Sequence, residues 1–125
     1  MIIVYISALI AAALHFVFFV LESLLWGTPT VNRIFKLQSE VAGSEAVRTF
    51  AFNMGFYNLF LSLGMVSGLT LIHSGRADGV ILLAFCSLSM VGAGLVLLLS
   101  SGWRRLPAAL VQALPPLVCL CALFG

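Results

Sequence analysis

Residues 1–26 read MIIVYISALIAAALHFVFFVLESLLW, and this stretch decides the class of protein. It is long and apolar enough to cross a bilayer, which takes about 20 residues in a helix. It also contains His15 and Glu22, which lie two helical turns apart and therefore share a face. Because a titratable side chain inside lipid costs free energy, such a pair predicts a functional site.

The composition extends this interpretation to the whole chain. Of the 125 residues, 62% are hydrophobic and only 8% are charged. A soluble domain is usually about one quarter charged, so this chain cannot cover a water-facing surface. We expect one transmembrane domain, residues 1–125, without a separate soluble part. The predicted fold is an all-α, integral-membrane four-helix bundle with helices over about residues 1–26, 44–72, 80–100 and 106–124.

The start of the chain lacks the positive charge that a cleavable signal peptide carries before its apolar run. The first Lys or Arg is Arg33, after the apolar run has ended. We therefore expect residues 1–26 to remain as a membrane helix of a multi-pass protein in the cell (inner) membrane, with lipid as its surrounding partner. No basic run indicates a nucleic-acid partner.

The first loop, residues 27–43, is the longest connection. Val31, Ile34 and Phe35 occur at helical spacing opposite charged neighbours. This pattern fits a short amphipathic helix lying in the membrane interface, and it fits an irregular solvated loop equally well.

Glycines at close spacing mark the second and third predicted helices. Gly64 and Gly68 form a GxxxG pattern, and Gly92 and Gly94 follow in the next helix. Small residues at this spacing let another helix approach closely. The partner is a helix of the same chain, which we favour, or a second copy in a homodimer that forms through these glycine-lined faces.

The three cysteines, Cys86, Cys119 and Cys121, all lie within apolar runs. Their spacing matches neither a zinc site nor a CxxC redox motif. Cys119 and Cys121 are two residues apart and therefore point to different faces of a helix. We interpret them as small packing residues and expect neither a metal nor a cofactor.

Basic residues are distributed unevenly over the loops. Five of the six occur in or beside the first and third loops, and only Arg76 lies in the second. The positive-inside rule then predicts that the first and third loops are cytoplasmic, so that both termini lie outside.

This orientation collects polar side chains in the cytoplasmic half of the membrane. Glu22 lies near the end of the first span, and His15 lies about 10 Å deeper. Because such groups cost free energy in lipid, they should face inward and pair. We interpret His15 and Glu22 as the catalytic or working residues and Arg48 as the ion-pair partner of Glu22. The candidate ligand-binding residues around them are Trp26, Asn53, Tyr57, Asn58 and Gln112.

Three segments resemble the family called domain of unknown function 1304: HFVFFVLESLLW (15–26), AFNMGFYNLFLSLGM (51–65) and VQALP (111–115). Members are small four-helix membrane proteins with H-x6-E-x3-W, N-x-G-x-Y-N-x-F-L-x2-G and Q-x2-P segments, and this chain matches all three. Met54 stands where the family usually has glutamine, and Ala113 where it often has glycine. The resemblance implies the architecture and the pocket residues over essentially the whole chain, and it implies no activity.

Three functions remain open. A binding protein or small transporter would hold a small, fairly apolar molecule between the helices, alone or together with a proton, and transport would require a dimer. An intramembrane isomerase would use His15 and Glu22 for proton transfer. A structural accessory subunit would use the polar groups only to bond its helices together.

Overall fold

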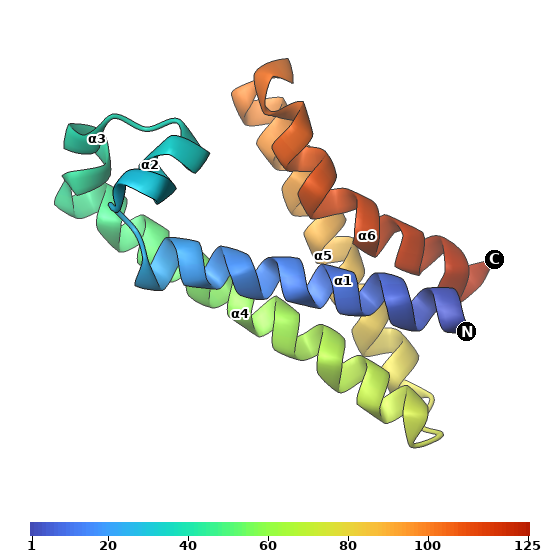
Figure 1. The fold of residues 1–125 in the computed structure, drawn as a ribbon. Coiled ribbons are helices and arrows are strands. Elements are labelled where there is room, and N and C mark those ends of the chain that lie inside the picture. The colour runs from blue at the N-terminus through green and yellow to red at the C-terminus, as the bar shows by residue number, and fades with distance from the viewer. The chain divides into compact units, whose positions relative to one another are not determined.

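The chain is all-helical in a computed structural model that describes every residue, Met1–Gly125 (Figure 1). Its elements are α1 (Ile2–Phe19), the π-helical turn η1 (Val20–Leu24), α2 (Pro29–Phe35), α3 (Ser39–Gly43), α4 (Glu45–His73), α5 (Asp78–Ser101), the 3-10 turn η2 (Trp103–Arg105) and α6 (Leu106–Phe124). Four segments are long and apolar enough to cross a membrane: Ile2–Leu24, Glu45–His73, Asp78–Ser101 and Trp103–Phe124. The predicted fold class is confirmed, and the protein is a multi-pass membrane protein.

The first span ends in a π-helical turn that the sequence analysis did not anticipate. The Leu25 N–H donates to the carbonyl oxygen of Val20 at 3.0 Å, five residues earlier rather than four. The helix therefore stops at Leu24, two residues before the predicted end, and Gly27 then turns the chain with a φ of 83°. Glu22 lies inside this turn, and π-helical turns of this kind occur frequently at functional sites.

The first loop contains two short helices, so the helical alternative is confirmed. Thr28 caps α2, because its hydroxyl accepts the Val31 N–H at 3.4 Å, and Pro29 occupies the first turn, where a missing N–H costs nothing. Lys36 ends α2 with a φ of 55°, in the left-handed region.

The contacts of the chain divide it into two compact units. The core unit consists of residues 1–14 and 61–125, and the site unit consists of residues 15–60. The prediction of one transmembrane domain over the whole chain stays a prediction.

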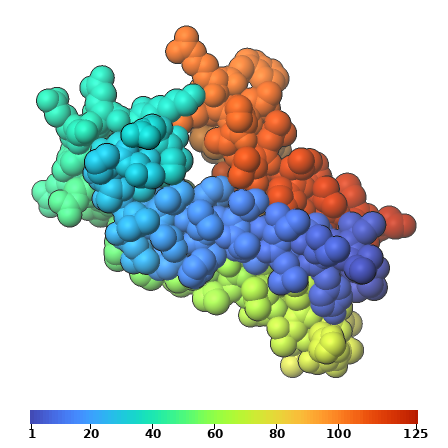
Figure 2. Space-filling model, viewed as in Figure 1, coloured from blue at the N-terminus to red at the C-terminus, as the bar shows by residue number.

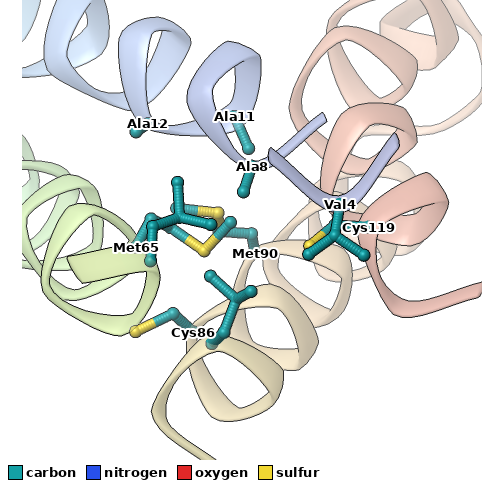
Figure 3. Close-up of a cluster of buried hydrophobic side chains, with 10 residues drawn as sticks. Val4, Ala8, Ala11, Ala12, Met65, Cys86, Met90 and Cys119 are labelled. Carbon is teal, nitrogen blue, oxygen red and sulfur yellow. The ribbon is translucent and has the colours of Figure 1, made fainter. Parts of the chain in front are cut away.

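The core unit is a bundle to which all four long helices contribute. Figure 3 shows the side chains of Met65 and Met90 meeting between α4 and α5, next to the alanines of α1. The Ser62 hydroxyl of α4 donates to the carbonyl oxygen of Ala12 in α1 at 2.8 Å. The buried apolar side chains that form this core are Val4, Ala8, Ala11, Ala12, Met65, Leu69, Leu83, Cys86, Met90 and Cys119.

Helical glycines bring the helices of the core unit close together. An added Cβ would contact a neighbouring helix at four positions: Gly64 against Cys86, Gly68 against Leu83, Gly79 against Ile72, and Gly94 against Ala113. A Cβ at Gly92 would meet nothing within 4 Å. The favoured interpretation, packing within one chain, therefore describes Gly64, Gly68 and Gly94, and a homodimer stays a prediction.

Two of the three cysteines are also small residues of this packed core. Cys86 and Cys119 are buried in the core unit, whereas Cys121 is exposed. The predicted difference in face between Cys119 and Cys121 is thus observed, and two of the three thiols act as small apolar packing groups.

Candidate functional site

A cavity of about 500 Å³ lies within the site unit. Residues from η1 and the chain just after it form one side, and the first two turns of α4 form the other. It combines two carboxylates, a guanidinium, two hydroxyls and two aromatic rings. The lining residues are Glu22, Ser23, Leu24, Trp26, Glu45, Arg48, Thr49 and Phe52.

Glu22 is the half-buried acid of this cavity, and α4 supplies its partner. The Nδ2 of Asn58 donates to Glu22 Oε2 at 2.8 Å. Asn58 is only 8% exposed, so its amide reaches the carboxylate from the buried face of α4. Two of the predicted site residues, 36 positions apart in the sequence, are therefore in direct contact.

Ser23 and Gly55 bring η1 and α4 together beside this pair. The Ser23 hydroxyl donates to the carbonyl oxygen of Phe52 at 2.8 Å. A Cβ at Gly55 would lie 3.0 Å from the Ser23 backbone nitrogen and 3.1 Å from the Phe19 carbonyl oxygen. Neither residue is among the candidate site residues, although Gly55 is the glycine of the N-x-G-x-Y-N segment. A glycine inside a helix, which costs about 1 kcal/mol relative to alanine, often has a packing reason.

Trp26 lines the cavity and also contacts both short helices. Its Nε1 donates to the carbonyl oxygen of Ala42 at 3.0 Å, and its ring centroid lies 5.4 Å from that of Phe35. Figure 2 shows the segment of the short helices, in cyan and teal, as one mass of side chains against the light-blue end of the first span. The indole therefore ties residues 27–43 to the end of this span.

Arg48 lines the cavity but does not form the ion pair that the sequence analysis expected. The partner of the Glu22 carboxylate is the Asn58 amide, and the Arg48 side chain is exposed. The physical reason is position along α4: Arg48 precedes Asn58 by ten residues, or about 15 Å at 1.5 Å per residue. Glu45 and Thr49, which flank Arg48, line the same cavity.

Asn53 and Tyr57 lie on a different face of α4. Both are exposed, and the Asn53 Nδ2 donates to the Thr49 carbonyl oxygen of its own helix at 2.8 Å. With 100° between successive residues, Tyr57 points away from the face that carries Asn58. The two residues line a second, smaller cavity of about 290 Å³ with Phe52, Phe56 and Phe60. Their ligand-binding role stays a prediction, and it does not concern the Glu22 cavity.

His15 and Gln112 are also outside the Glu22 cavity. His15 is fully buried in α1, with its ring edge-on to Phe18 at a centroid distance of 5.4 Å. Gln112 is half-buried in α6 and belongs to the core unit. Of the candidate residues, the cavity thus combines Glu22, Trp26 and Arg48, with Asn58 bonded to its acid.

Comparison with known proteins identifies the family. The family described as "Protein of unknown function (DUF1304)" matches residues 9–124. No curated protein and no solved structure matches the chain. The matched region contains both segments that form the site, namely η1 with Glu22 and the part of α4 with Asn58. This chain, with its four candidate membrane spans, therefore belongs to the DUF1304 family, whose function is unknown.

Proposed function

We propose that this membrane protein binds a small, fairly apolar molecule in the Glu22 cavity. The observation that carries the proposal is a half-buried carboxylate that lines a cavity and is held there by Asn58. An ionisable group within a membrane span costs free energy, so its presence favours a functional role. The cavity volume of about 500 Å³ falls within the range of roughly 300–1,000 Å³ that small-molecule sites occupy.

The lining suits a molecule with an apolar body and one polar group. Trp26 and Phe52 supply aromatic surface, whereas Glu22 and Thr49 supply polar contacts. Five of the eight lining side chains are polar or charged, which is more than the few polar groups of a typical small-molecule site, so the polar group of the ligand would have several partners.

The isomerase alternative receives less support from the same geometry. It requires an acid and a base at one cavity, and only Glu22 of the two predicted residues lines it. The accessory-subunit alternative predicts that the Glu22–Asn58 contact only bonds helices together, so it is the interpretation that a binding experiment must exclude.

Native mass spectrometry from a mild detergent tests the proposal. The wild-type protein is expected to carry a bound small molecule, which Glu22→Gln loses. Glu40→Gln is the matched control, because Glu40 is an exposed carboxylate of α3 outside the cavity lining. A wild-type protein without any bound molecule, or one whose bound molecule persists in Glu22→Gln, contradicts the proposal.

Transport of the bound molecule, with or without a proton, is a further part of the proposal that requires a homodimer, because four helices enclose too narrow a path. The same spectra report the oligomeric state. A dimer mass supports transport, and a monomer mass limits the protein to binding.

We also propose that the Glu22 cavity faces the cytoplasmic half of a cell membrane, with both termini outside. The support is the excess of Lys and Arg in and beside the first and third loops. In a cysteine-free background, Lys36→Cys is expected to resist a membrane-impermeant thiol reagent in whole cells, whereas Ser74→Cys reacts. The reverse pattern contradicts the orientation.

A further inference from the structure

We infer that the ligand of the Glu22 cavity is an organic cation, a protonated amine or an onium group carried on an aromatic or aliphatic body. This inference rests on the proposed function and names the chemical class that the cavity selects.

The first argument is the charge of Glu22. Its one hydrogen-bond donor within the site unit is the neutral amide of Asn58, which orients the carboxylate without balancing a negative charge. Arg48, a cation that lines the same cavity, does not pair with it. A carboxylate in this setting is stabilised by an opposite charge, because charges at membrane depth pair with one another. A ligand cation in the cavity would supply that charge.

The second argument is the aromatic surface. The indole N–H of Trp26, the only hydrogen-bond donor of its side chain, donates to the Ala42 carbonyl oxygen. The part of this side chain that can contact a ligand is therefore the face of its ring. Phe52 lines the same cavity and offers only a ring. Indole and phenyl faces attract cations within about 6 Å of the ring centre, and tryptophan does so most strongly.

The third argument is the balance of charge around the cavity. Two carboxylates, Glu22 and Glu45, and one guanidinium, Arg48, line it, which leaves one net negative charge when all three are ionised. Arg48 is exposed, so water screens its charge, whereas Glu22 is half-buried and is screened less. The amino end of α4 would favour an anion, but Glu45 in its first turn offsets that dipole.

Two ions of the same shape and opposite charge test the inference: tetraphenylphosphonium and tetraphenylborate. Binding to the detergent-solubilised full chain is followed by the fluorescence of Trp26. The second tryptophan, Trp103, is 78% exposed in η2 and is replaced by Trp103→Phe in every sample. Each ion is titrated into this background and into its Glu22→Gln, Arg48→Gln and Glu40→Gln versions.

The expected result is saturable binding of tetraphenylphosphonium that Glu22→Gln weakens about tenfold or more, because the Coulomb attraction between the phosphonium and the carboxylate is lost. Arg48→Gln should tighten phosphonium binding severalfold by removing a like charge, and Glu40→Gln should leave it unchanged. Tetraphenylborate should show only the non-saturable partition into detergent that is the same in all four proteins.

Arg48 is exposed, so Arg48→Gln keeps the inference testable even when Glu22→Gln does not fold. Weaker phosphonium binding in Arg48→Gln overturns the inference, as does saturable borate binding that Glu22→Gln strengthens. When neither ion binds in a way that depends on Glu22, the cation class is wrong. In that case native mass spectrometry separates the two proposals: a bound molecule lost in Glu22→Gln preserves the proposed function, and its absence removes both.

Discussion

The core unit and the site unit use their polar residues in different ways. Six of the ten charged residues lie in residues 15–60, and the other four, Arg76, Asp78, Arg104 and Arg105, occur at the ends of helices in the core unit. In the core unit, the Ser7 and Ser62 hydroxyls donate to backbone carbonyl oxygens. In the site unit, a carboxylate receives a hydrogen bond from an amide side chain on another helix.

The difference shows which contacts hold the helices together and which are available for function. Lipid is as apolar as leucine, so burial alone does not drive helices together, and close packing must do so. The core unit meets this need with glycine, alanine and sulfur-containing side chains. The Glu22–Asn58 pair of the site unit adds an ionisable group that packing does not require. The predictions below test this contrast from the largest expected effect to the smallest.

Gly79→Leu should cause the largest loss of stability. A Cβ at this position would lie 2.7 Å from the Gly68 carbonyl oxygen and from the Ile72 nitrogen, and backbone atoms cannot move aside as side chains do. The expected result is little or no folded protein in detergent, measured by size-exclusion chromatography and circular dichroism. Gly92→Ala is the control, since no atom lies within 4 Å of its added Cβ. A Gly79 variant as stable as this control would show that the close approach of α4 and α5 does not matter.

Leu83→Ala should destabilise the core unit by about 2–3 kcal/mol, the low end of the range for buried leucines, because the fully buried side chain loses its packing contacts and leaves a cavity, whereas transfer from water contributes little in lipid. The measurement is the shift in thermal or denaturant unfolding in detergent. Leu88→Ala, on the same helix but 61% exposed, should cost far less. Equal losses at the two positions would mean that the packing of this core does not determine stability.

Asn58→Ala should destabilise the protein by about 1–3 kcal/mol, because it removes a hydrogen bond to a half-buried carboxylate. A double-mutant cycle with Glu22→Gln isolates the energy of the pair, and a non-additive result is expected. Asn53→Ala is the comparison, because its amide bonds only to its own helix and is exposed. Strict additivity of Glu22→Gln and Asn58→Ala would argue that the two side chains do not interact.

Asp78→Asn should have the smallest effect. Asp78 and Arg76 form an ion pair between side chains that are 50% and 61% exposed, and exposed pairs contribute little because water screens them. The hydrogen bond and the charge of Asp78 raise the pKa of Arg76, which is charged at neutral pH with or without this partner. We expect an unchanged melting temperature at low and at high salt. A clearly lower melting temperature of Asp78→Asn at low salt would show that an ion pair also stabilises the core unit.

The number and approximate limits of the membrane spans were predictable because they depend on local properties. Hydrophobicity over about 20 residues marks a span, and glycine with proline marks its end. The spacing of Val31 and Ile34 also fitted a helix in the first loop, but it fitted an irregular loop equally well. The π-helical turn around Glu22 was not predictable, since it depends on how η1 packs against Gly55 and Ser23 bonds to Phe52.

The candidate site was predicted only in part. Glu22 and Asn58 were both named from the sequence, but Arg48 was expected as the partner of the acid, and Asn53 and Tyr57 were placed beside it. Helical periodicity states which residues share a face of one helix. It does not state which face meets a neighbouring helix. Arg48 lies about 15 Å along α4 from Asn58, the residue that lies opposite Glu22, and therefore does not take its place.

By itself, the sequence determined that lipid is the main solvent of this protein, that four segments can cross it, and that an acid lies at the end of the first. These conclusions need only the hydrophobicity and order of neighbouring residues. The tertiary structure alone decided that Asn58 holds Glu22, that Trp26 and Phe52 line the cavity with it, and that His15 does not. The reason is that such contacts join residues from separate helices, whose meeting depends on the close approach at Gly55 rather than on any local pattern.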